Sequence, residues 1–152
     1  MLLALCIATM MTAFAQDPSQ VETKIKEIVK QYDAVKGVDC ITVTKGSGLG
    51  LIKVMLNQQF GKDFMRGVTS ITIINYSEAS QETCLALRNE IDQLATLLQD
   101  FKLGDNKEFS EYSYIRSLAA IAGENAISDF IVAMENKDTK TIMYMSGKIK
   151  VE

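Results

Sequence analysis

Three segments of the chain carry apolar residues at spacings of three and four, which is the period of an amphipathic helix. The spacing predicts helices over residues 19–35, 49–60 and 77–101. The residues expected to face inward in the first two are Val21, Ile25, Ile28, Tyr32, Val35, Leu49, Ile52, Met55, Leu56 and Phe60. In the third they are Cys84, Leu87, Ile91, Leu94, Leu98 and Phe101, after Ser80 as the N-cap. This last set spans under three heptads, so it favours a core-facing helix over a coiled-coil dimer.

Alternating segments rich in β-branched residues predict strands. These segments are residues 38–44, 69–76, 110–121, 127–135 and 140–148. Polar turns at residues 123–125 and 136–138 separate the last three, which predicts an antiparallel meander. The order α-β-α-β-α-β-β-β indicates an α+β fold, with one mixed sheet of about five strands and helices packed on one face. We expect the two early strands to be parallel or separated, because a helix joins them.

The first residues, MLLALCIATMMTAFAQ, are uncharged and strongly apolar, and Ala13-Phe14-Ala15 forms an A-x-A pattern. This is typical of the apolar region and cleavage site of a secretory signal peptide, although no Lys or Arg precedes the apolar run. A membrane anchor is less favoured, because a spanning helix needs about 20 residues and this apolar run is about 15 residues long. We expect residues 1–15 to be a signal peptide and residues 16–152 to form a single α+β domain. The expected location is the periplasm or outer envelope, with no integral membrane segment after cleavage.

The composition of the 152-residue chain, 47% hydrophobic and 23% charged, allows a buried core. A net charge of -3 without a dense basic segment does not favour nucleic acid as a partner. The chain has no histidine, which excludes the usual Ser-His-Asp and Cys-His arrangements and the commonest zinc ligand. We therefore expect no catalytic residue, no metal and no cofactor. Asp105, Glu108 and Glu111 surround one turn, but their spacing favours a solvated acidic turn over a calcium loop.

A glycine-rich turn, KGSGLG at residues 45–50, joins the predicted strand at 38–44 to the predicted helix at 49–60. Many dinucleotide sites have this order of elements, but they need G-x-G-x-x-G, and here the third glycine comes one residue early. The P-loop pattern also fails, because no Gly-Lys-Ser/Thr follows. We expect a turn whose dihedral angles require glycine, with at most weak anion binding at the helix N-terminus.

Two cysteines, Cys40 and Cys84, remain after the predicted cleavage removes Cys6. An oxidising compartment allows them to form a disulfide. Each also suits a buried apolar position, Cys40 in a strand and Cys84 on the apolar side of a helix. The sequence favours two buried thiols and leaves the disulfide open.

The predicted last strand is rich in methionine on one face, because Met143 and Met145 alternate with Ile142 and Tyr144. If helices cover only one face of the sheet, the other face exposes apolar side chains to a partner or ligand. A sheet covered on both faces, or an edge strand beneath a loop, would bury them instead. Met143 and Met145 are therefore a candidate partner surface.

The succession of segments is similar to that of a known group of proteins. Its parts are an apolar N-terminus, a helix ending in YDAVKGV (32–38), a strand leading to Thr44-Lys45, a helix with Leu51, Ile52, Met55 and Leu56, a strand at 71–76, a long helix, and a three-stranded end with SGKI (146–149). The chain resembles the small exported proteins of unknown function that are common in Bacteroidetes-type bacteria. The resemblance implies an envelope location and an α+β fold, and it supplies no catalytic residues.

Two hypotheses follow for the function. The first is an exported, non-enzymatic domain that binds an envelope protein partner. The second is a carrier of a small ligand or lipid, with a pocket between the helices and the sheet. An enzyme with carboxylate chemistry is a distant third, and the oligomeric state stays open.

Overall fold

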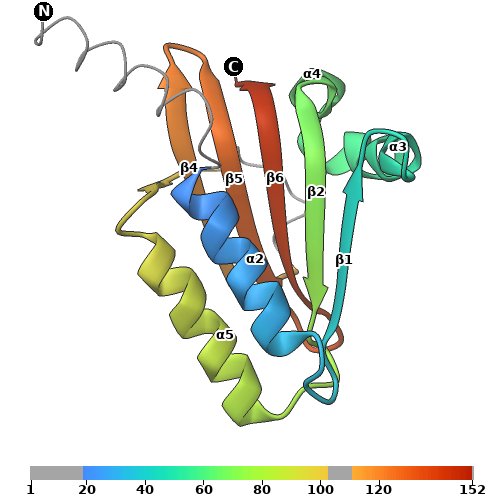
Figure 1. The fold of residues 1–152 in the computed structure, drawn as a ribbon, viewed down its shortest axis with the longest axis vertical. Coiled ribbons are helices and arrows are strands. Elements are labelled where there is room, and N and C mark those ends of the chain that lie inside the picture. The colour runs from blue at the N-terminus through green and yellow to red at the C-terminus, as the bar shows by residue number, and fades with distance from the viewer. Residues whose placement is uncertain (1–18, 103–110, 152) are drawn as a thin grey trace, which may run out of the picture.

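The computed structural model describes residues 19–102 and 111–151 of the protein. These residues form a six-stranded antiparallel sheet with the order β1-β2-β6-β5-β4-β3, against which four helices pack (Figure 1). The strands are β1 (Asp39–Thr44), β2 (Val68–Asn75), β3 (Gln99–Asp100), β4 (Tyr114–Gly123), β5 (Ala126–Glu135) and β6 (Lys140–Lys150). The helices are α2 (Gln20–Tyr32), α3 (Leu49–Phe60), α4 (Lys62–Arg66) and α5 (Gln81–Leu94).

The predicted α+β class is confirmed, but the sheet is antiparallel in every pairing rather than mixed. The two early strands, β1 and β2, are antiparallel because α3 and α4 lie at the end of β1 and do not return along the sheet (Figure 1). β2 therefore starts opposite the end of β1, where Thr44 faces Ser70. The long predicted helix ends at Leu94, and a sixth short strand, β3, follows it.

Helices cover both faces of the sheet, which corrects the expectation that they pack on one face only. α2 and α5 lie next to each other across one face (Figure 1), where they bury Ile74, Ile131 and Tyr144 of the sheet. α3 and α4 contribute Leu49 and Met65 to a second core on the opposite face. The sheet thus separates two apolar cores.

Serine side chains begin the two long helices. Ser19 Oγ accepts a hydrogen bond from the backbone N–H of Glu22 at the start of α2. Ser80 Oγ accepts one from the N–H of Thr83 at the start of α5, which confirms Ser80 as the N-cap. The buried side of α5 carries Cys84, Leu87, Ile91 and Leu94, all from the predicted apolar spacing.

β5 runs through the middle of the sheet, and every residue from Asp129 to Glu135 is buried. This burial on both faces follows from the two helical layers. Two of these residues are acidic, and a buried carboxylate needs hydrogen-bond donors or a cation. Asp129 and Glu135 therefore show where the sheet carries polar structure inside the core.

Candidate functional site

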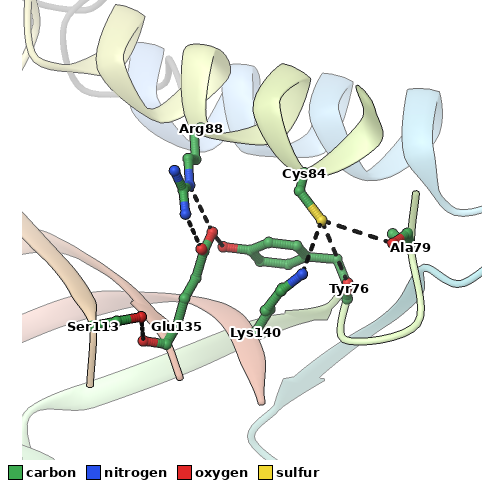
Figure 2. Close-up of polar contacts among 7 residues, drawn as sticks. All are labelled: Tyr76, Ala79, Cys84, Arg88, Ser113, Glu135 and Lys140. Atoms are coloured by element: carbon green, nitrogen blue, oxygen red, sulfur yellow. Dashed lines mark hydrogen bonds and ion pairs between the residues drawn. The ribbon is translucent and has the colours of Figure 1, made fainter. Parts of the chain in front are cut away.

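A polar cluster lies beneath α5, around the buried carboxylate of Glu135 (Figure 2). Tyr76, directly after β2, donates a hydrogen bond from its hydroxyl to Glu135 Oε1 at 2.7 Å. Arg88 on α5 donates from Nε to the same oxygen at 2.9 Å and from Nη2 to Oε2. The Arg88 guanidinium also lies 4.6 Å from the centre of the Tyr114 ring. Groups from α5 and from the residue directly after β2 thus meet at one carboxylate of β5, and Tyr114 of β4 contacts the Arg88 guanidinium.

A thiol and an amine lie at the other side of the same cluster (Figure 2). Lys140 Nζ donates to the sulfur of Cys84 at 3.6 Å. The Cys84 thiol in turn lies 4.0 Å from the carbonyl oxygen of Tyr76 and 3.9 Å from that of Ala79. Cys84 is therefore enclosed by the chain just before α5 and by the start of β6.

The electrostatics of this cluster keep Glu135 ionised and Tyr76 protonated. Hydrogen bonding from Arg88 is the main cause that lowers the pKa of Glu135, against the opposing effect of burial. Burial, followed by the hydrogen bond to Glu135, raises the pKa of Tyr76. A carboxylate held between two donors forms a stable ion pair, which joins α5 to the sheet. This arrangement accounts for the cluster as a structural contact.

A second buried carboxylate, Asp129, serves the N-terminus of α2 in a similar way. Tyr144 donates to Asp129 Oδ1 at 2.6 Å, and Ser19 donates to the same oxygen at 3.0 Å. Ser128 donates to Oδ2 at 3.0 Å. Since Ser19 is also the N-cap of α2, this group fixes the first turn of the helix to the sheet.

The candidate partner surface at Met143 and Met145 is wrong for this structure, because both side chains are buried. Met143 is 5% exposed and Met145 is 0% exposed. Both belong to the second core, where Met65 of α4 and Phe130 of β5 are also buried. The prediction assumed that one face of the sheet is not covered by helices, but α3 and α4 cover that face.

Both cysteines of the described residues are free thiols. Cys84 is buried, and Cys40 is half-buried on the edge strand β1. Burial is the main cause that raises the pKa of Cys40 to about 11, and the nearby charges of Asp33 and Asp39 add to it. Cys40 is therefore a poor nucleophile near neutral pH.

The glycine-rich turn adopts the dihedral angles that its sequence predicts. Gly46 has a φ of 91° and Gly48 a φ of 96°, a region that side chains other than glycine rarely occupy. Gly48 is the N-cap of α3 and Gly50 lies inside the helix. The turn therefore serves to reverse the chain between β1 and α3.

The predicted acidic turn lies only partly within the described residues. Asp105 and Glu108 fall outside them, and so do residues 1–15 of the predicted signal peptide. Glu111 is exposed. Among residues 19–102 and 111–151, no three His, Cys, Asp or Glu side chains come together in a way that could hold a metal ion. The helices of this part of the chain are also too short or too polar to cross a membrane.

Sequence reasoning missed an exposed apolar surface on α3. Leu51 is 70% exposed, and Val54 and Met55 are each 66% exposed. These three residues, called the α3 apolar surface below, lie one turn apart on one side of the helix. Met55 was expected to face inward. The signal was present in the sequence, because α3 is apolar almost all round and only one side of a surface helix can pack on a sheet.

Searches against models of protein families, curated proteins and solved structures found nothing that matches this chain. The function is therefore inferred from the geometry described above.

Proposed function

We propose that the protein is an exported, non-enzymatic domain that binds an envelope protein through the α3 apolar surface. The observation that carries the proposal is the exposure of Leu51, Val54 and Met55, at 66–70% each. Large apolar side chains gathered in this way mark interaction sites more often than isolated ones do.

The geometry of α3 indicates the chemistry of the partner. Leu51, Val54 and Met55 stand at positions i, i+3 and i+4 of a helix, which is the pattern that an apolar groove accepts. The opposite side of α3 is anchored, since Leu49 is buried and Ile52 and Leu56 pack against the second core. The helix can therefore present its outer side without leaving the sheet. The expected partner carries an apolar groove about two turns of helix in length.

The polar clusters of the described residues support a non-enzymatic role. The carboxylates of Glu135 and Asp129 are each held by hydrogen bonds inside the core. These hydrogen bonds join α5 and the start of α2 to the sheet. Export is supported by the apolar residues 1–15 and the A-x-A pattern that ends them.

Site-specific photo-crosslinking in intact cells tests the proposal. A benzophenone amino acid replaces Val54 in one variant and Leu85 in a control variant. Leu85 is a suitable control because it is also an apolar, exposed residue of a helix, at 50% exposure on α5. We expect a discrete protein adduct from position 54 and none of the same mass from position 85.

A second pair of variants shows whether the adduct depends on the surface. Leu51→Gln with Met55→Gln, in the chain with the crosslinker at position 54, should abolish the adduct while the protein stays folded. An equal adduct from positions 54 and 85, or one that persists in the double variant, would contradict the proposal. N-terminal sequencing of the same material should begin at Gln16 if export follows the predicted cleavage.

A further inference from the structure

The outer edge of β1 has backbone groups that the sheet leaves free. β1 is an end strand of the sheet, six residues long, with β2 on one side only. Tyr76 N–H donates to Lys140 O, so even-numbered residues of β2 point toward β6 and odd-numbered ones toward β1. Since Val43 faces Ile71, odd-numbered residues of β1 bond β2, and even-numbered ones point outward.

One of the three outward residues is already occupied. Thr44 N–H donates to Ser47 Oγ at 2.8 Å, and Thr44 O accepts from the N–H of Ser47 at 3.0 Å. Cys40 and Thr42 have no such bond from their outward backbone groups within residues 19–102 and 111–151. The free part of the edge is therefore the short stretch from Cys40 to Thr42.

This free stretch is complementary to itself. If two copies meet antiparallel around a two-fold axis, Cys40 of each copy can face Thr42 of the other in a hydrogen-bonded pair. That register uses all free outward groups and leaves the groups occupied by Ser47 undisturbed. If the register shifted by one pair, Thr42 would face Thr42 of the other copy. Cys40 would then face Thr44, whose outward groups Ser47 already occupies.

The side chains favour the same register. Ile41, which is 58% exposed, then faces Ile41 of the other copy in the closer, non-hydrogen-bonded type of pair. Asp39 then faces Val43 of the other copy, two residues before Lys45 in the turn after β1, so this register brings opposite charges near each other twice by symmetry. The edge also lacks proline, and β1 carries no lysine, the residues that usually protect such strands.

We propose that two copies of this chain pair through β1, with Ile41 facing Ile41 and Cys40 facing Thr42, so that two six-stranded sheets form one continuous sheet. The pairing uses the edge of β1 and not the α3 apolar surface, so it is independent of the proposed function.

Disulfide trapping of the register tests this pairing. In a Cys40→Ser background, Ile41→Cys places the new thiol opposite itself, whereas Thr42→Cys places its thiol opposite position 40 of the other copy, where the background has removed the sulfur. With mild copper–phenanthroline oxidation, we expect the Ile41→Cys protein to form a covalent dimer about tenfold faster than the Thr42→Cys protein. Equal rates, or a faster Thr42→Cys reaction, would overturn the register.

Sedimentation equilibrium of the unlinked protein tests the association itself. The wild type should sediment as a dimer at roughly tens of micromolar. Thr42→Pro, which removes an outward N–H and also the hydroxyl that bonds Thr72 at 3.0 Å, should be a folded monomer by circular dichroism. Ile41→Lys is a second variant with the same expected outcome, should the proline affect folding. A wild type that stays monomeric would overturn the proposal of a second copy. So would a β1 edge that, in cells, cross-links only to an extended segment of another protein.

Discussion

Tyr76, directly after β2, and Glu135, the last residue of β5, meet beneath α5, where the Tyr76 hydroxyl donates to Glu135 Oε1 at 2.7 Å. Arg88 reaches the same carboxylate from the helix. Glu135 is 3% exposed, so its charge depends on these two donors rather than on water. The contact explains how a mostly apolar interface also fixes the position of α5.

Arg88→Met should destabilise the fold by about 2–3 kcal/mol, because it leaves the buried Glu135 carboxylate without its hydrogen-bonded cation. The measurement is urea unfolding at pH 7, followed by circular dichroism. Arg66→Met is the matched control, since Arg66 pairs with Asp63 at the surface and both side chains are largely exposed. Its expected effect is under about 0.5 kcal/mol, and similar losses for both variants would show that Glu135 does not need Arg88.

The pH dependence of stability should carry the signature of Glu135. Its pKa is lowered in the folded state, so its stabilising contribution is complete above the unfolded pKa and is lost as the pH falls through the folded pKa. From about pH 5 to about pH 3, the free energy of unfolding should therefore fall more steeply for the wild type than for Glu135→Gln. Parallel curves for the two proteins would be inconsistent with the ion pair.

Replacing two different glycines by alanine should change the stability of the fold in opposite directions. A Cβ at Gly67 would lie 1.9 Å from the carbonyl oxygen of Lys148, so Gly67→Ala should cost more than about 2 kcal/mol. Gly50 is in α3 with open space around it, so Gly50→Ala should stabilise the protein by about 0.5–1 kcal/mol. Thermal unfolding of both variants measures these changes in stability. A small loss of stability in Gly67→Ala would mean that β6 does not pass this close to Gly67.

Thiol labelling should find two reduced cysteines of low reactivity. Because the pKa of Cys40 is raised to about 11, its alkylation by iodoacetamide should accelerate about tenfold per pH unit between about pH 7 and pH 10. Cys84 should label only when the protein unfolds, since it is buried. Peptide mass spectrometry separates the two sites, with the urea-unfolded protein as the control. A Cys40–Cys84 disulfide in protein isolated without reductant would refute the free-thiol state.

Much of the secondary structure could be predicted from local pattern. The apolar spacing of α2 and α5 reflects burial of one side of each helix, which a sequence records directly. β2 was recognised from its β-branched residues, and it is buried on both faces, with Ile71 in one core and Ile74 in the other. The direction of β1 against β2 could not be predicted in this way. It depends on α3 and α4 staying at one end of the sheet, and that placement is set by tertiary packing rather than by local spacing.

The site was harder to predict than the fold for a related reason. Met143 and Met145 are apolar residues of a strand whichever face is covered, and their burial is decided by α4, which sequence reasoning did not identify as a helix. Glu135 carried no signal of burial until Tyr76 and Arg88 were brought to it by the fold. Leu51 and Val54 were visible as surplus apolar residues on α3, and helical geometry alone could have marked them as exposed.

Native mass spectrometry of the protein isolated from the cell envelope, compared with the Leu51→Gln/Met55→Gln variant, tests the proposed function most directly. We expect the wild type to carry a second protein, distinguishable by mass from another copy of the chain, and the variant to lack it. A wild type that retains only a small molecule, or that carries the same protein after the α3 apolar surface is removed, would contradict a partner-binding role for this helix.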